Sequence, residues 1–151
     1  MDITTLAAWG EFIGGIAVVV SLGYLAVQIR TNTKTVRASN YRDVLGGMSG
    51  FNTMTVDPET AALYVRGLDD FVGLSVEDQV RFQGLMSNVI NPLNQAFVLH
   101  QKDLLEDAMM ENTKHAVAGV FGDPGVRQWW EASQHWWPPD FREFVRETTG
   151  Q

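Results

Sequence analysis

Residues 12–29 read FIGGIAVVVSLGYLAVQI, eighteen consecutive positions without a charged side chain. A helix rises about 1.5 Å per residue, so this stretch spans about 27 Å, close to the roughly 30 Å hydrocarbon core of a bilayer. Trp9 and Tyr24 lie near opposite ends of the extended run 6–29, and aromatic side chains are favoured at membrane interfaces. The stretch therefore predicts one transmembrane helix within residues 1–29.

Two other structures also contain apolar runs of this kind. A secretory signal peptide starts with positive charges and ends at a small-residue cleavage site, whereas this N-terminus carries Asp2 and the run leads into Gln28, Ile29 and Arg30. We therefore expect an uncleaved anchor. The buried core helix of a soluble protein stays an alternative, because Glu11, Ser21 and the interspersed glycines interrupt the apolar character.

The charge of the chain is distributed unevenly. The 151 residues carry a net charge of −7, yet Arg30, Lys34, Arg37 and Arg42 follow the apolar run with no acid among them. Lys and Arg beside a span are retained on the cytoplasmic side, so we expect the N-terminus outside and the bulk of the chain in the cytoplasm. The expected organisation is an anchor (1–29), a juxtamembrane basic helix (30–50) and an acidic cytoplasmic helical domain (51–151).

Small and polar side chains form a stripe along the predicted span. The members recur at spacings of four and three: Gly10, Gly14, Ala17, Ser21, Tyr24 and Gln28. Small residues let two transmembrane helices approach closely, and serine can hydrogen-bond across the interface. The stripe predicts a homo-oligomer interface; the alternative is a monomeric span in which the glycines have no partner.

Glu11 is the acid nearest to the apolar run. One interpretation is a carboxylate stabilised by the helix dipole at the outer membrane interface. The other is a ring of carboxylates at the mouth of an oligomeric pore, with Ser21 and Gln28 further along its wall.

The rest of the chain is expected to be helical. Apolar spacing, capping residues, prolines and glycines predict helices over 30–50, 58–67, 75–104, 103–121, 124–135 and 139–146, with Pro92 kinking or breaking the third. No alternating pattern typical of strands is present. The predicted fold class is all-α, with an N-terminal transmembrane helix followed by a small cytoplasmic helical bundle.

Four tryptophans form an aromatic cluster near the C-terminus: Trp129, Trp130, Trp136 and Trp137. The pairs are seven residues apart, which puts counterparts on nearly the same face of a helix. We expect them to seal the C-terminal helices onto the bundle. The alternatives are rings at the headgroup level of the membrane and an aromatic pocket for an apolar ligand.

Motifs for catalysis or cofactor binding are not found. The chain has no cysteine, which excludes disulfides, thiolate zinc sites and iron–sulfur clusters. His100, His115 and His135 lack metal-ligand spacing, and the acidic pairs Asp69–Asp70 and Glu106–Asp107 lack a calcium-loop pattern. We expect no enzyme activity, no cofactor and no metal, and the acidic balance disfavours nucleic acid as a partner.

Residues 11–15 and 21–30, with Asn32 and Thr33, resemble the opening of a set of uncharacterised small bacterial membrane proteins. The resemblance continues through 57–59, 66–68, 125–127, Trp129, Trp130 and Phe141. Those proteins have an N-terminal span and a helical remainder. The resemblance implies a bacterial inner-membrane location and transfers no catalytic residue.

Three classes of function follow as expectations. The preferred one is a self-associating, membrane-anchored scaffold or regulatory module, with the lipid bilayer, further copies and another membrane protein as candidate partners. The second is an oligomeric channel or transport-accessory subunit. The third is an anchored ligand-binding or enzymatic bundle.

Overall fold

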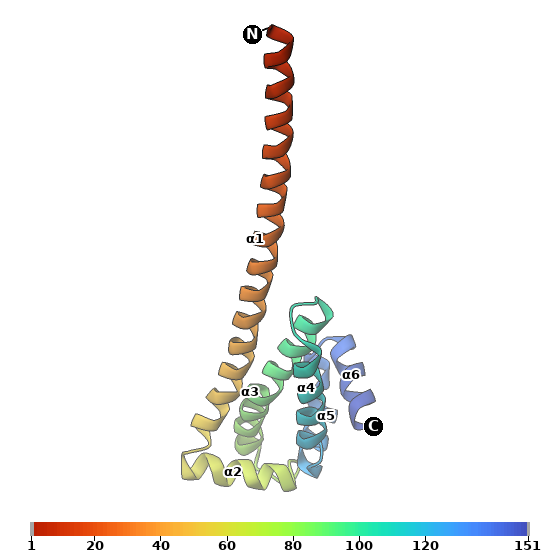
Figure 1. The fold of residues 1–151 in the computed structure, drawn as a ribbon. Helices are drawn as coiled ribbons and strands as arrows, with labels where there is room; N and C mark the ends of the chain where they lie inside the picture. The colour runs from red at the N-terminus through yellow and green to blue at the C-terminus, as the bar shows by residue number, and fades with distance from the viewer. Residues whose placement is uncertain (1, 151) are drawn as a thin grey trace. The chain divides into compact units, whose positions relative to one another are not determined.

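The computed structural model describes the backbone of residues 2–150, and the side chains of this range except those of residues 5, 6, 8, 48, 50 and 51. Within this range it contains helices and turns and no strand, which confirms the all-α prediction of a long apolar N-terminal helix followed by a helical bundle (Figure 1). The helices are α1 (Ile3–Met54), α2 (Pro58–Asp69), α3 (Val76–Gln101), α4 (Asp107–Val120), α5 (Pro124–Ser133), the short 3₁₀ helix η1 (Gln134–Trp136) and α6 (Pro139–Thr149).

The chain forms two compact units, residues 1–38 and residues 39–151. The first is helical, and each of its residues from 9 to 36 is exposed. The second contains the end of α1 and all the other helices. The division falls inside the predicted juxtamembrane segment 30–50, because Val44 is already part of the bundle core, where it packs with Ala96, Leu105 and Met109.

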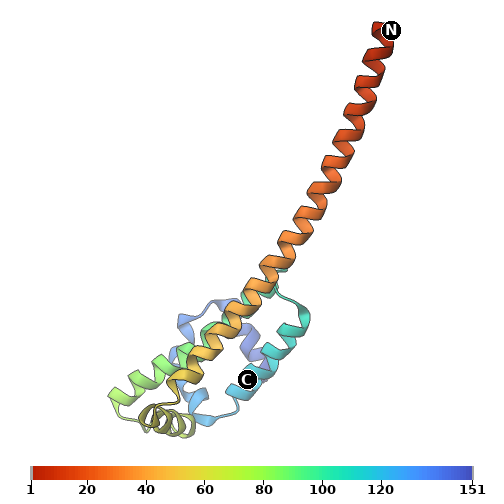
Figure 2. The same ribbon diagram turned by 60° about the vertical axis from the view of Figure 1, so that its left-hand side comes forward.

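Gly47 explains why the end of α1 stays helical through a glycine-rich stretch. A Cβ atom at Gly47 would lie 2.7 Å from Cγ of Pro92 in α3, so the missing side chain lets the two helices approach. Gly47 therefore serves packing, and α1 continues through this stretch as an unbroken helix (Figure 2). Of the two effects predicted for Pro92, a kink or a break, the break is wrong, because α3 runs continuously from Val76 to Gln101.

Gly67 and Gly125 define the close crossing of α2 and α5. A Cβ atom at Gly125 would lie 1.9 Å from the carbonyl oxygen of Gly67, and one at Gly67 would lie 2.1 Å from Cδ2 of Phe82. Gly67 was expected to end its helix, but α2 continues to Asp69. The glycine is required by these contacts rather than by a helix end.

The main bundle core is built chiefly from α3, α4, α5 and α6, and partly buried side chains of α2 pack against it. Fully buried side chains come from α3 (Phe82, Met86 and Ile90), α4 (Val117), α5 (Val126 and Trp129) and α6 (Phe141). In Figure 1, α2 crosses the foot of the steeper α3, α4 and α5, and it packs against α3 and α5. The buried positions recur at helical spacing along α3, as an amphipathic helix requires.

Several predicted helix ends differ from the observed ones. The fourth helix was expected from Asp103 but begins at Asp107, because Asp103 adopts a positive φ of 56° in the preceding turn. The fifth ends at Ser133 instead of His135, and the sixth extends past Arg146 to Thr149, where Gly150 caps it with a φ of 70°. These shifts of two to four residues leave the order of the helices as predicted.

We predict that Gly125→Ala destabilises the bundle by at least about 1–3 kcal/mol, since the new methyl group would force α2 and α5 apart. Gly84→Ala is the matched control, because Gly84 lies inside α3 with nothing within 4 Å of its Cβ position. That change should stabilise the protein by about 1 kcal/mol. Unfolding of the full chain in detergent, followed by tryptophan fluorescence, measures both. Equal stabilities of the two variants would contradict the crossing.

Candidate functional site

The apolar run of α1 is exposed throughout. Trp9, Val19 and Ile29 are 54%, 68% and 66% accessible, and every residue of 9–29 is exposed. Within Trp9–Met54, α1 is long and apolar enough to cross a membrane, and none of the tested window is buried. A core helix of a soluble protein passes the same length and composition test, but it is mostly buried. The run therefore differs from such a core helix.

The predicted small-residue stripe lies on one face of this exposed helix. A Cβ atom at Gly10 or Gly14 would meet nothing within 4 Å, and the Ser21 hydroxyl donates to the Ala17 carbonyl at 2.8 Å. Thr31 and Thr35 continue the same spacing, whereas the stripe predicted from the sequence ended at Gln28. Thr35 donates to the carbonyl of Thr31 at 3.1 Å. The stripe thus extends over 10–35 without a charged residue.

Glu11 and Gln28 occupy different positions relative to this stripe. Gln28 belongs to it and shares an open surface of α1 with Tyr24, Thr31 and Thr35. Glu11 follows Gly10 by one residue, which places it about 100° around the helix. Glu11, Ser21 and Gln28 therefore do not share a single line along α1, as a common pore wall would require.

The four predicted interface bases also lie on α1. Arg30, Lys34 and Arg42 are exposed, and Arg37 is partly buried. Arg30, Lys34 and Arg37 follow the spacing i, i+4 and i+7, so they share one face. Arg42 comes five residues after Arg37, about 140° around the helix.

The tryptophans meet through a chain reversal rather than along one helix. Trp136 and Trp137 lie beyond the end of α5, so the expected common helical face is wrong. Trp137 precedes Pro138 in an extended conformation, and its ring returns to within 5.5 Å of Trp129 and 5.2 Å of Trp130, measured between ring centroids. These three rings are buried. Among the four, Trp136 alone is exposed, at 53%.

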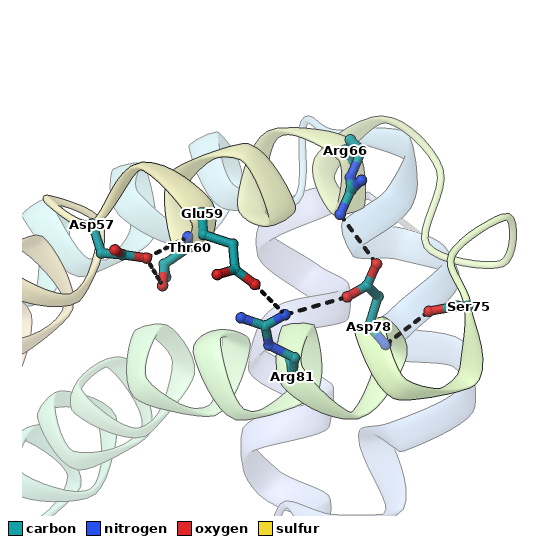
Figure 3. A network of polar contacts seen from close by, with 7 residues as sticks. All are labelled: Asp57, Glu59, Thr60, Arg66, Ser75, Asp78 and Arg81. Carbon is teal, nitrogen blue, oxygen red and sulfur yellow. Dashed lines mark hydrogen bonds and ion pairs between the residues drawn. The ribbon is translucent and has the colours of Figure 1, made fainter.

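A polar network joins α2 to α3 (Figure 3). Arg66 bonds Asp78 at 3.1 Å, and Arg81 bonds Glu59 at 2.9 Å and lies 3.7 Å from Asp78. The hydrogen bond and charge of Glu59 raise the pKa of Arg81 above its ordinary value. Sequence inspection missed these pairs, because residues 12 and 22 positions apart give no local signal. Exposed pairs of this kind orient helices and contribute little to stability.

Asp57 caps the start of α2. The backbone N–H and the hydroxyl of Thr60 both donate to its carboxylate at 2.8 Å, and these bonds lower the pKa of Asp57 below 3.8. Ser75 caps α3 in the same way, accepting from the N–H of Asp78 at 3.2 Å. Both caps lie at the helix starts that the sequence predicted, near residues 58 and 75.

The remaining candidate residues are dispersed over the bundle. His100 lies 3.1 Å from Asp107, and Lys114 donates to Glu111 at 2.6 Å, which lowers the pKa of Glu111. Among the described residues no group of three or more His, Cys, Asp or Glu side chains could hold a metal ion. The acidic side chains of the described residues are therefore not gathered into a metal-binding site.

Two shallow hollows lie on the bundle. One of about 470 Å³ between α5 and α6 is lined by Trp130, Arg142 and Arg146, but also by Glu131 and Glu143, so its charge does not select an anion. The other, of about 450 Å³ between α4 and α6, likewise mixes Lys114 and His115 with Glu111 and Glu147.

No family model, no curated protein and no solved structure matches this chain. The exposed apolar run of α1 and the bases that follow it are the candidate functional site on geometric grounds.

We predict that Asp57→Asn weakens the acid sensitivity of the bundle. The folded-state pKa of Asp57 is depressed, so its stabilisation is present above pH 3.8 and is lost as pH falls through the lower folded-state value. Asparagine caps helices without titrating in this range. Melting temperatures between pH 2 and pH 7 should therefore fall less steeply in Asp57→Asn, whereas Asp57→Ala should lower them already at pH 7. Identical pH profiles for wild type and Asp57→Asn would contradict the capping role.

Proposed function

We propose that this chain is a membrane-anchored helical protein of the bacterial inner membrane. Residues 9–29 form the anchor, and residues 39–151 act as an acidic cytoplasmic scaffold or regulatory surface. The observation that supports this proposal is the complete exposure of the apolar run on α1. Moving one large aliphatic or aromatic side chain out of water is worth about 1.5–3 kcal/mol, so the free energy of the run is far lower in lipid than in water.

The charges on either side of the run support the orientation. Asp2 and Glu11 lie at the N-terminal end of the run, whereas four bases follow its C-terminal end: Arg30, Lys34, Arg37 and Arg42. Basic residues within 15–20 positions of a span are retained in the cytoplasm. The proposal therefore places the N-terminus outside and the bundle inside the cell.

The proposal includes self-association of α1 through its uncharged stripe. Lipid-facing positions gain nothing from glycine, whereas two helices in contact gain van der Waals packing where side chains are small. The spacing of four and three is the heptad spacing of helices that pack over a long contact. A second copy carries the same stripe, and no charge on it opposes a parallel arrangement.

The anchor is tested by the membrane fraction of the expressed full chain. We expect wild type to resist carbonate extraction and Val19→Arg/Leu22→Arg to become extractable, because an arginine at mid-span costs about 2.5–3.5 kcal/mol. The matched control is Val72→Arg/Val76→Arg, which adds the same charge at bundle positions 67% and 80% exposed. Recovery of soluble wild type would overturn the proposal, and an intact mass well below 16.8 kDa would identify a cleaved signal sequence instead.

Self-association is tested by the native mass in mild detergent. We expect Gly14→Leu and Ser21→Leu to dissociate a defined oligomer, because both side chains would wedge the stripe apart. Gly23→Leu is the control: it is also free of contacts within 4 Å, but it lies nine residues from Gly14, half a turn around the helix. A monomeric wild type, or equal dissociation by Gly23→Leu, would remove the oligomer from the proposal and leave the anchor in place.

A further inference from the structure

Arg30, Lys34 and Arg37 form a basic face that begins where the apolar run ends. Arg30 directly follows Ile29, the last residue of the run, and no acid lies between Phe12 and Arg42. Seven residues of helix separate Arg30 from Arg37, a rise of about 10 Å. The three bases therefore lie within roughly one Debye length of the point where an anchored α1 would leave the hydrocarbon.

This basic face is distinct from the stripe proposed for self-association. Each of its bases comes one residue before a position that continues the stripe, as Arg30 comes before Thr31 and Lys34 before Thr35. One residue corresponds to about 100° around a helix. A second copy packed on the stripe would therefore leave the basic face turned toward lipid.

We infer that Arg30, Lys34 and Arg37 bind the phosphate groups of anionic phospholipids. The inference rests on the proposed anchor, because only insertion of the apolar run brings the face to headgroup level. Guanidinium and ammonium groups are the side chains that recognise phosphate, and each base near an anionic membrane surface strengthens binding about fivefold. Lipid is favoured over a soluble acidic partner by the continuity of the face with the exposed apolar run.

The test is native mass spectrometry of the full chain from micelles that contain equal amounts of phosphatidylglycerol and phosphatidylcholine. We expect wild type to retain phosphatidylglycerol over phosphatidylcholine by at least about fivefold, the effect of one base. The triple variant Arg30→Gln/Lys34→Gln/Arg37→Gln should retain the two lipids about equally. Raising the salt to 0.5 M before transfer should reduce the preference of wild type, since exposed charges are then screened.

The matched control removes the same charge elsewhere. Arg42→Gln/Lys102→Gln/Lys114→Gln changes three exposed bases outside the face and should keep the wild-type preference. An equal loss in this control would show a net-charge effect and overturn the inference, as would a wild type with no lipid preference at either salt concentration.

Flotation with vesicles of phosphatidylcholine alone tests the anchor separately from the lipid-binding basic face. Wild type and both triple variants should float, because the anchor needs no anionic lipid. Flotation of wild type without any preference for phosphatidylglycerol would overturn the lipid face and leave the anchor. Failure of wild type to float would overturn the proposed anchor, and the lipid face with it.

Discussion

The apolar surface of residues 9–29 is the constraint on which the other features of α1 depend. The bundle fills its core with its own side chains, from Phe82 in α3 to Phe141 in α6, while the residues of the run stay exposed. Apolar surface of this kind is unfavourable in water, and lipid or a second helix would cover it. This explains the two neighbouring features. The small-residue stripe lies on the surface that a second helix would cover, and the bases after Ile29 lie at the end of the run that lipid would cover.

Local signals predicted the order of the α-helices in the bundle. Asp57 before Pro58, Ser75 before α3 and Asp123 before Pro124 each mark a helix start in the structure. Caps and prolines act within three or four residues, so the sequence contains all the information they use. The apolar run is predictable for the same reason, because length and the absence of charge are local properties.

Contacts between distant residues account for the predictions that failed. Gly67 looks like a helix end, yet it lies inside α2 because the backbone of α5 and the ring of Phe82 leave no room for a side chain there. Pro92 looks like a helix break, yet α3 continues and packs its ring against Gly47. Trp137 joins Trp129 through a chain reversal that no helical periodicity describes. In each case the decisive neighbour lies between eight and 58 residues away in the printed sequence.

The polarity of the stripe on α1 decides what kind of contact it can make. The hydroxyls of Ser21, Thr31 and Thr35 already donate to carbonyls of their own helix, so in a second copy they contribute small size and acceptor oxygens rather than free donors. Gln28 differs, because its amide makes no hydrogen bond among the described residues. An amide at the end of an apolar run is satisfied by water at the interface or by the same amide of another copy. Glycine and alanine thus determine how closely two helices approach, and Gln28 favours the register in which like residues meet.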